Sequence, residues 1–399
     1  MPTTEYKPST GLRLCATVGR FMQDLFHYKL AARNPYLLPI PALLDRELVE
    51  DCYLAVETIF DAAKGRNEYS TSWTLAEYRA GERKGKDGKT TKEFPRAKSH
   101  RYQEQPILID SPCHVSDSDG KVVAWYLPGA ISSRRQAQVE KAIVELSDAM
   151  EKPLPIVQDV KSTWRTNSFF FRDPEECAVR PGCVCFSPCW YSQAHPPPNH
   201  EPGPSQTLAS DTNSEEFIRS LQEYNALVGG MLAVIHPDLY RVALGTWKAI
   251  HNSSEGCTRP ERVRELLEIW ASPFTAVSLI VNRETPLHKD RLGGQYYLDA
   301  VSTFGNYVNG RFEIPALGMR FRYNPGCVIF LNSYTFAHGA SRVEGERYCI
   351  ASFFRPNMIK NGSSYHPGAE SMPAIQDYRR FYVENFGKGK SRVEEEEEE

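Results

Sequence analysis

Three side chains in the last third of the sequence have the types and spacing of a metal site. His288 and Asp290 stand one residue apart in TPLHKDRLGG, directly after the apolar segment TAVSLIVN. A second histidine, His338, follows 48 residues after Asp290 in CVIFLNSYTFAHGAS. Two imidazoles and one carboxylate on one face of iron(II) leave positions open for oxygen and a co-substrate. The pattern therefore predicts an iron site made by these three residues.

A second His-x-Asp pair, His236 and Asp238, competes for this role. It stands in IHPDLYR, where helical periodicity follows at once and Pro237 suits a first helical position. We interpret this pair as a helix entrance. His-x-Asp alone is common by chance, so the metal prediction depends on the pair, its β context and the distal histidine together.

An arginine near the distal histidine is the candidate for binding a carboxylate. Arg347 follows His338 by nine residues, and GASRVEGE between them indicates a turn that folds a hairpin and returns Arg347 to the histidine. A guanidinium binds a carboxylate through two parallel hydrogen bonds, which suits the far end of 2-oxoglutarate. Arg355 shares strand parity with Arg347, but eight further residues place it about 26 Å away, beyond reach of that ligand. Asn282 is the candidate for the near carboxylate.

The composition is that of a soluble globular protein of 399 residues. No run of 18 or more apolar residues occurs, so we expect no membrane-spanning helix, and we expect a monomer. The net charge of -3 includes six glutamates at 394–399, so the remaining chain carries +3, and we expect a solvated acidic tail. The N-terminus lacks the pattern of a secretion signal, so the ten cysteines are expected to be reduced.

Apolar periodicity predicts the elements that must position these residues. Helices are predicted at 41–63, 134–150 and 214–235, and strands at 106–110 and 121–129, joined through SDSDG. From about 275 to 356, short β-rich segments separated by Gly, Pro or Asn indicate a sandwich or a jelly-roll barrel. We therefore expect an α+β protein organised as an irregular arm at 1–33, a supporting region at 34–270, a β core at 271–360 within the same domain, and an extension at 361–399.

The segment 79–101 is strongly basic, with nine Lys or Arg against three acids. Its glycines favour a flexible loop over a helix. The basic side chains are candidates for contact with nucleic-acid phosphates, and the same run could serve nuclear import. The candidates are Arg83, Lys84, Lys86, Lys89, Lys92, Arg96, Lys98 and Arg101.

The segment 177–214 is rich in proline and cysteine, and we expect an exposed loop there. Several of its residues are of types that bind zinc, although the paired C-x-x-C pattern of known zinc sites is missing. A structural zinc site and an ordinary loop both stay open. The zinc-competent residues are Cys177, Cys183, Cys185, Cys189, His195 and His200.

The segment from NRETPLHKD to RYCIASFFR resembles the iron(II)/2-oxoglutarate-dependent dioxygenases. Within that superfamily it is similar to the TET/JBP family of nucleic-acid base oxygenases, and most similar to its fungal branch. The shared pieces are His-x-Asp, a strand ending in Pro-x-Leu-Gly, Pro-Gly before the distal strand, His-Gly and Gly-x-Arg. The resemblance implies a double-stranded β-helix with iron on His288, Asp290 and His338 and with 2-oxoglutarate on Arg347.

The resemblance also implies a reaction. Oxygen and 2-oxoglutarate would be consumed, and a methyl group on 5-methylcytosine or N6-methyladenine would be hydroxylated in duplex DNA. Such a base must be flipped out of the duplex to reach the metal. We therefore expect a DNA-binding nuclear protein that acts in DNA demethylation.

Three alternatives stay open at this point. The same scaffold serves hydroxylases of proteins or RNA, which a neutral or acidic cleft without affinity for DNA would favour. A degenerate oxygenase fold used only for binding would lack a metal ligand or the carboxylate-binding arginine. The three metal ligands and Arg347 are all present. A zinc-dependent binding module is the third alternative, and the irregular cysteine spacing argues against it.

Overall fold

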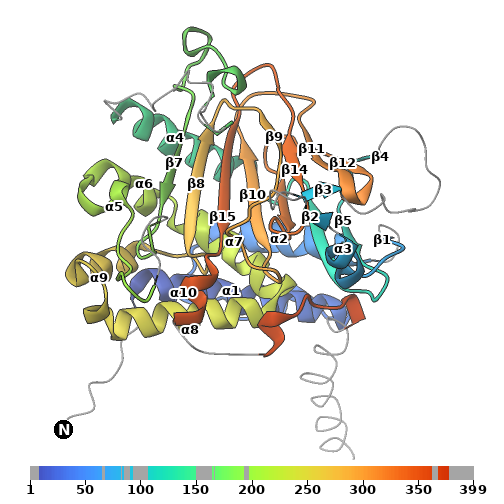
Figure 1. The fold of residues 1–399 in the computed structure, drawn as a ribbon. Coiled ribbons are helices and arrows are strands. Elements are labelled where there is room, and N and C mark those ends of the chain that lie inside the picture. The colour runs from blue at the N-terminus through green and yellow to red at the C-terminus, as the bar shows by residue number, and fades with distance from the viewer. Residues whose placement is uncertain are drawn as a thin grey trace, which may run out of the picture.

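Two β-sheets face each other at the centre of the computed structural model (Figure 1). The structure describes residues 9–64, 68–81, 83–84, 90–92, 107–149, 164–165, 167–192, 197–361 and 367–376. The larger sheet, called the major sheet, contains β1 (Glu68–Ser70), β5 (Cys113–Ser116), β6 (Val122–Leu127), β7 (Gly182–Phe186), β8 (Ala276–Val281), β10 (Asp299–Phe304), β13 (Val328–Leu331) and β15 (Tyr348–Phe353). The minor sheet contains β4 (Ile107–Ile109), β9 (Thr285–His288), β11 (Arg311–Ile314), β12 (Met319–Arg322) and β14 (His338–Ala340).

The strands from β8 to β15 pass back and forth between the two sheets. Their order in the major sheet is β13-β10-β15-β8, and their order in the minor sheet is β12-β11-β14-β9. Neighbouring strands within these two groups are antiparallel. This alternation is the double-stranded β-helix, so the predicted jelly-roll core is confirmed. β7 and the pair β5–β6 extend the major sheet on either side of this core.

The two faces of β15 meet different surroundings. Phe304 of β10 packs edge-on against Tyr224 of helix α7 (Gln222–Ile235), with 5.5 Å between ring centroids. Tyr348 pairs with Phe304 in the sheet, so the buried residues Tyr348, Ile350 and Ser352 face the helices. Because side chains alternate along a strand, Cys349 and the other odd-numbered residues face the minor sheet. This side is the interior of the jelly roll.

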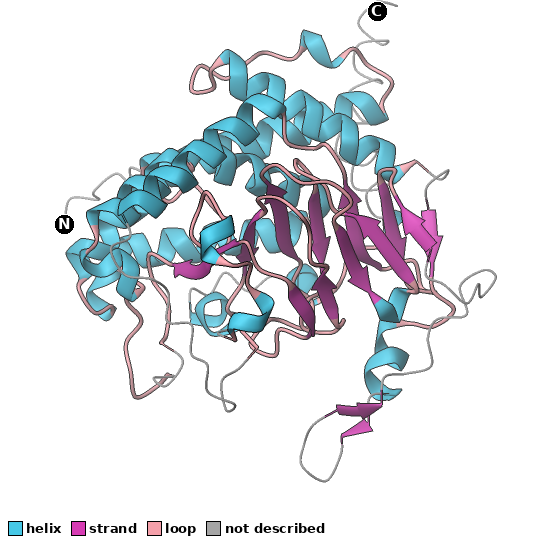
Figure 2. Cartoon of the chain, turned by 90° about the horizontal axis from the view of Figure 1, so that it is seen from above, coloured by secondary structure: helices cyan, strands magenta, loops and turns pink. Residues whose placement is uncertain are grey.

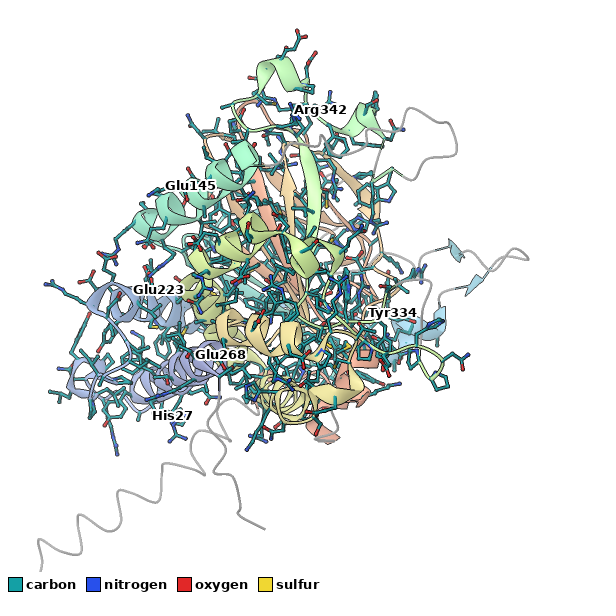
Figure 3. The ribbon with its side chains drawn as sticks, turned by 90° about the vertical axis from the view of Figure 1, so that its left-hand side faces the viewer. His27, Glu145, Glu223, Glu268, Tyr334 and Arg342 are labelled. Carbon is teal, nitrogen blue, oxygen red and sulfur yellow. The ribbon has the colours of Figure 1, made fainter. Side chains whose placement is uncertain are left out.

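Helices cover the outer face of the major sheet (Figures 1 and 2). Figure 3 shows Glu145, Glu223 and His27, from three of these helices, along one side of the molecule, and Tyr334, from the turn before His338, on the other. The helices in chain order are α1 (Thr10–Leu30), α2 (Arg46–Ala63), α3 (Leu75–Gly81), α4 (Ser133–Ala149), α5 (Gln206–Ser210), α6 (Thr212–Ser220), α7, α8 (Pro237–Asn252), α9 (Pro260–Ile269) and α10 (Pro356–Asn361). None in the described part of the chain is long and apolar enough to cross a membrane.

The prediction of an irregular N-terminal arm is wrong. Residues 10–30 form α1, which buries apolar side chains at helical spacing, among them Val18, Met22 and Leu25. Its glycines lower helix propensity in a sequence, but here they permit close packing. A Cβ on Gly19 would lie 2.2 Å from the hydroxyl oxygen of Tyr240 in α8.

The other helix predictions hold with one correction. α2 and α4 are confirmed, and the expected helix entrance is confirmed because Pro237 opens α8 after His236. The predicted helix at 214–235 is two helices, α6 and α7, which meet at Leu221. α6 begins earlier than expected because the carboxylate of Asp211 accepts hydrogen bonds from the backbone N–H groups of Asn213 and Ser214.

Several loop and strand predictions need correction. The strands at 106–110 and 121–129 do not pair: β4 joins β12, whereas β6 pairs with β5, a strand that the sequence analysis missed. The segment 177–214 contains β7 and α5. The basic segment contains a hairpin of β2 (Arg83–Lys84) and β3 (Thr90–Lys92), which stands away from the body in Figure 2. Lys86, Lys89, Arg96, Lys98, Arg101, His195 and the glutamate tail lie outside the described residues. The proposed domain boundaries stay predictions.

The position of α1 in the core makes a stability prediction. Leu25 is fully buried, so Leu25→Ala should lower the free energy of unfolding by about 2–5 kcal/mol. Arg20→Ala is the control, because this arginine makes an exposed pair with Asp24 that is worth less than about 1 kcal/mol. Urea denaturation of both variants tests the point. Equal, small losses in the two variants would mean that α1 is a dispensable arm.

Candidate metal centre

The three predicted ligands meet at one end of the minor sheet. β9 and β14 run antiparallel, and their register places His338 opposite His288. Asp290 follows two residues after His288, and its backbone N–H donates to the carbonyl of Ser333 (3.0 Å), in the turn before β14. The ligand atoms of the three side chains all lie within 4.8 Å of one another. The structure therefore brings together the three residues that the sequence proposed.

Each histidine presents the same nitrogen to the centre. The Nδ1 atom of His288 lies 3.0 Å from the carbonyl oxygen of Pro286, and that of His338 lies 3.0 Å from the carbonyl oxygen of Phe336. A carbonyl oxygen only accepts, so each Nδ1 carries the proton and each Nε2 is left with a free lone pair. The Nε2 atoms of His288 and His338 lie 3.6 and 3.7 Å from the two carboxylate oxygens of Asp290.

The electrostatics of the site favour metal-binding protonation states. Burial lowers the pKa of His338 to about 4, and the neighbouring His288 acts in the same direction, so the His338 ring is neutral at physiological pH. Burial alone would raise the pKa of Asp290, but its contacts with His288, His338 and Arg165 lower it by more. The pKa of Asp290 therefore lies well below its usual range. Neutral imidazoles and an ionised carboxylate are the forms that bind a cation.

A polar network fixes the turn that carries Ser333. The hydroxyl of Ser333 donates to the buried carboxyl of Asp299. The side chain of Asn332 donates to the carbonyls of Gln295 (2.7 Å) and Tyr297 (3.1 Å), and accepts from the N–H of Thr335 (2.9 Å). These bonds tie the turn before His338 to the loop that follows Asp290. They therefore hold the two halves of the metal site in place.

Arg347 lies beside the chain that follows His338, but the predicted hairpin does not place it there. β14 and β15 belong to different sheets, so the segment between them crosses the jelly roll. Arg347 is buried, and its guanidinium donates to the carbonyls of Ser341 (2.5 Å) and Arg283. Ser341 follows His338 by three residues. Since a guanidinium has five donors, Arg347 keeps capacity for a carboxylate.

Asn282 has a different role from the one predicted. Its amide donates to the carbonyl of Val179 (2.9 Å) and to the carboxylate of Glu346 (2.7 Å), and its oxygen accepts from the N–H of Arg347 (2.9 Å). Both hydrogens of the amide are used in these contacts. Asn282 thus clamps the start of β15, and its contacts give no support to the prediction that it binds the near carboxylate.

The distance of Arg355 from Arg347 along β15 does not exclude Arg355 from the metal site. Arg355 is mostly buried near the far end of β15, yet the charges of Asp299 and Asp290 both act on its pKa, after the lowering effect of burial. The metal site lies alongside β15 rather than at its first residue, so distance along that strand from Arg347 does not measure distance from the metal. The guanidinium of Arg355 stacks on Phe353, 4.7 Å from the ring centroid.

Arg283, Trp164 and Arg165 also surround the centre, and the sequence analysis missed all three. Arg283 is 5% exposed, and burial lowers its pKa, with Arg165 and Arg347 as further cations nearby. Its Nε is buried with no hydrogen-bond partner among the described residues. The only sequence signal was an arginine at the end of a buried strand, five residues before His288.

These features fit iron(II) and 2-oxoglutarate. The triad supplies the two imidazoles and one carboxylate that iron(II) takes with positions left open. Arg283 and Arg347 are buried cations, and no carboxylate of the described residues forms an ion pair with either. Because buried charges require a counter-charge, this arrangement suits a small dicarboxylate beside the metal.

The cysteine cluster is divided between two places. Cys185 lies 2.8 Å from the hydroxyl of Ser278 on the interior face of β7, whereas the sulfur of Cys189 lies 3.6 Å from that of Cys257. Among the described residues, the group of His288, Asp290 and His338 is the one that could hold a metal ion. The zinc site stays a prediction.

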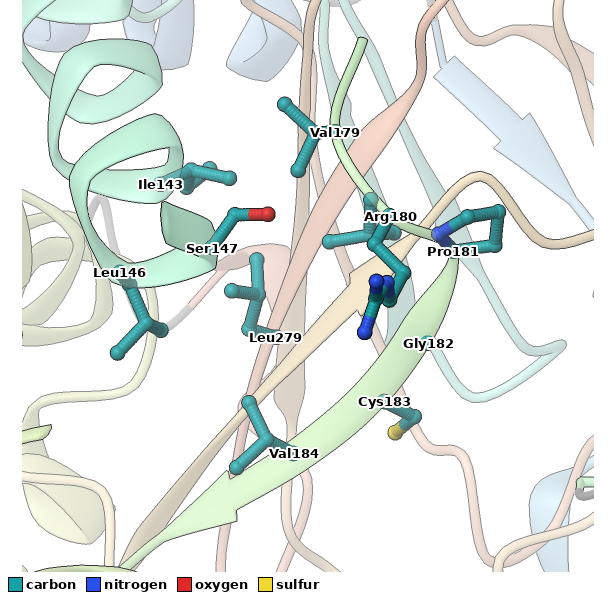
Figure 4. Close-up of a pocket in the computed structure, with 11 residues that line it drawn as sticks. Ile143, Leu146, Ser147, Val179, Arg180, Pro181, Gly182, Cys183, Val184 and Leu279 are labelled. Carbon is teal, nitrogen blue, oxygen red and sulfur yellow. The ribbon is translucent and has the colours of Figure 1, made fainter. Parts of the chain in front are cut away.

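A small apolar cavity lies away from the triad (Figure 4). It measures about 30 Å³ and is enclosed by Ile143 and Leu146 of α4, the chain from Val179 to Val184, and Leu279 of β8. None of the metal ligands lines it, so this cavity is a packing gap between α4 and the major sheet.

A jelly roll with a His/Asp/His triad and buried interior arginines defines the class: a mononuclear iron(II) oxygenase dependent on 2-oxoglutarate. Residues 187–356 match the family model Tet_JBP, the oxygenase domain of the 2OGFeDO superfamily. This match confirms the resemblance seen in the sequence. The fungal branch stays a prediction.

Solved structures similar to the chain share little sequence with it. One is NgTET1 in complex with 5mC DNA, with 12% identity and a TM-score of 0.43, covering 65% of this chain and 81% of that one. Another is an oxidoreductase of the 2OG-Fe(II) oxygenase family from Burkholderia pseudomallei, with 13% identity and a TM-score of 0.28, covering 60% and 85%. No curated protein sequence matches the chain. The assignment rests on the family match and the site.

The metal site makes a direct prediction. His338→Ala should weaken iron(II) binding by more than the about 10- to 100-fold lost when only a hydrogen-bond partner of a ligand is removed. Asp238→Asn is the matched control, because it alters the other His-x-Asp pair. Anaerobic titration with iron(II), read by calorimetry, gives both affinities. Equal affinities in the two variants would remove His338 from the site.

Asp299 predicts a pH effect on stability. Burial raises the pKa of this carboxyl to about 7, so the folded protein keeps a proton that the unfolded chain releases near its ordinary value. Stability should therefore fall as pH rises from about 4 to 7, by at most about 1.4 kcal/mol per pH unit. Asp299→Asn should remove this part of the slope. Denaturation profiles of the two proteins that run parallel from pH 4 to 7 would contradict the assignment.

Proposed function

We propose that this protein hydroxylates the methyl group of a methylated base in DNA, 5-methylcytosine or N6-methyladenine, using iron(II), 2-oxoglutarate and O2. The match of residues 187–356 to the Tet_JBP oxygenase domain, with all three metal ligands inside the match, is the observation that carries the proposal. NgTET1, one of the similar structures, is bound to 5mC DNA. A role in DNA demethylation in the nucleus is part of the same proposal.

The position of the basic hairpin supports a nucleic-acid substrate. α3 lies against the loops that carry the metal ligands, since Arg79 donates to the hydroxyl of Thr335 (3.1 Å) and to the carbonyl of Gln295. Lys289, between two of the ligands, lies over the ring of Tyr78 at 5.5 Å. β2 and β3 follow α3 directly and carry Arg83, Lys84 and Lys92. A basic hairpin that follows α3 in the chain suits the phosphates beside a flipped base.

The protein residues would divide the chemical work. Iron(II) and 2-oxoglutarate, when bound, would allow O2 to deliver one oxygen atom to a methyl C–H bond and the other to succinate, with release of carbon dioxide. His288, Asp290 and His338 would hold the metal, and Arg347 with Arg283 would orient the dicarboxylate. The jelly-roll interior would exclude bulk water. A hydroxymethyl group would remain on cytosine, whereas N6-methyladenine would lose formaldehyde.

One reaction tests the substrate. The protein is loaded anaerobically with iron(II) and 2-oxoglutarate, then exposed to oxygen with duplex oligonucleotides that carry 5-methylcytosine, N6-methyladenine or no methyl group. We expect 5-hydroxymethylcytosine or adenine, with an equal amount of succinate, from one methylated duplex, and neither product from His288→Ala. Mass spectrometry of nucleosides and organic acids measures both.

The other outcomes separate the competing substrates. Succinate without base oxidation in DNA would keep the oxygenase but overturn the DNA proposal, and the same assay with methylated RNA or protein would follow. Base oxidation that survives in His288→Ala would overturn the role of the triad. Asp238→Asn serves as the folded, active control.

A further inference from the structure

Two residues outside the jelly roll touch two of the three metal ligands. The Nη2 atom of Arg165 lies 3.0 Å from Oδ1 of Asp290. The ring of Trp164 lies against that of His288, with 4.6 Å between centroids and an interplanar angle of 52°. These neighbours come from the supporting region, more than 120 residues before the ligands that they contact. The pair thus joins that region directly to the metal centre.

The contact of Arg165 constrains how Asp290 can turn. One carboxylate oxygen faces both Arg165 and the Nε2 of His288, and the other faces the Nε2 of His338. A charge-assisted hydrogen bond to the first oxygen holds the plane of the carboxylate, and both oxygens keep further lone pairs. Asp290 is 39% exposed even with this contact, so loss of the contact would give its carboxylate freedom to turn toward solvent.

Trp164 acts on the other ligand. A single hydrogen bond from Nδ1 to the carbonyl of Pro286 sets the direction of the His288 ring. The indole of Trp164 and the ring of His338 both pack against the His288 ring, with centroid distances of 4.6 and 4.4 Å. Packing against both rings, together with the hydrogen bond, restricts the orientation of the imidazole.

The segment that carries the pair is itself fixed to the core. Trp164 contacts the guanidiniums of Arg165 and Arg283, which lie 4.5 and 5.0 Å from the centre of its ring. Further along, Phe171 forms a β-bridge with Arg283, and the N–H of Glu284 donates to the carbonyl of Phe170 at 2.7 Å. The residues between β8 and β9 therefore hold the segment in register with the strand that ends in His288.

We propose that Arg165 and Trp164 are positioning residues that preorganise the metal site, Arg165 by fixing the carboxylate of Asp290 and Trp164 by fixing the ring of His288. The proposal rests on the metal site of the proposed function, but not on its substrate. Partners of metal ligands commonly raise metal affinity by holding the ligand in its binding orientation. If Arg165 instead competed with the metal for Asp290, its removal would strengthen metal binding.

Metal affinity without turnover tests the proposal. Cobalt(II) alone is titrated into the metal-free full-length protein, and its visible absorption reports on binding. Arg165→Ala should weaken cobalt binding by about 10- to 100-fold, and Arg165→Lys should restore part of the loss, because a point charge replaces the planar fork. Trp164→Ala should also weaken binding, and Trp164→Phe should retain more affinity than Trp164→Ala.

Matched controls separate positioning from folding. Arg342→Ala removes another exposed arginine near the site, which pairs with Glu284 at 3.5 Å and is labelled in Figure 3, and it should leave cobalt affinity unchanged. The melting temperatures of the metal-free variants show whether the fold is retained. A variant that loses cobalt affinity together with its melting transition counts against a positioning role.

The outcomes distinguish this proposal from the proposed function. Tighter cobalt binding in Arg165→Ala would identify the arginine as a competitor and overturn the proposal. Unchanged affinity in both alanine variants would overturn it as well. Absence of cobalt binding by the unaltered protein would overturn the metal site and this proposal together. Normal cobalt binding with no oxidised base would overturn only the substrate, and the effect of Arg165 on affinity would still be measured.

Discussion

The pairing of β9 with β14 is the constraint on which the rest of the molecule depends. This register places His338 opposite His288 and irregularly pairs Ala340 with Thr285. A shift of the register by one residue would turn one histidine to the other face of the sheet, and the two histidines could then no longer bind one metal ion. The network of Ser333, Asp299 and Asn332 fixes the turn before β14, so it acts on the same register from one side. The positions of the two histidines are therefore set by strand pairing, and Asp290 follows from the end of β9.

The interior of the jelly roll holds an imbalance of charge that a ligand would relieve. Arg283 and Arg347 are both buried and repel each other, and Arg283 has a lowered pKa for which burial is the main cause. An anion bound between them would supply the missing counter-charge and would stabilise the folded state in proportion to its affinity. Two buried like charges therefore destabilise the folded state, and a bound anion would offset this destabilisation. Such sites are where a protein departs from its most stable arrangement in favour of function.

The sequence predicted the parts of the site that local patterns encode. His-x-Asp after an apolar strand and a distal histidine after another are short-range signals, and the alternation along β8 to β15 gave the jelly roll. The passage of the chain from β14 in one sheet to β15 in the other leaves no such signal. A hairpin was therefore predicted there in error, although Arg347 was still proposed as the carboxylate-binding residue. Arg355 was misplaced for a related reason, since distance was counted along one strand rather than across the barrel. The roles of Trp164 and Arg165 could not be predicted from the sequence, because the residues that they contact are more than 120 residues away in the chain.

The two faces of β15 have different environments, because the helices cover one face and the other lies toward the minor sheet. Tyr348, Ile350 and Ser352 need the helices to bury them, and α1 contributes to that layer through its contacts with α7. Arg347, Cys349 and the other odd-numbered positions face the interior, where only part of the surface is filled. A strand buried on one face by helices is held rigidly enough to keep polar groups on its other face at fixed positions. The helices therefore support the site by holding β15 in place.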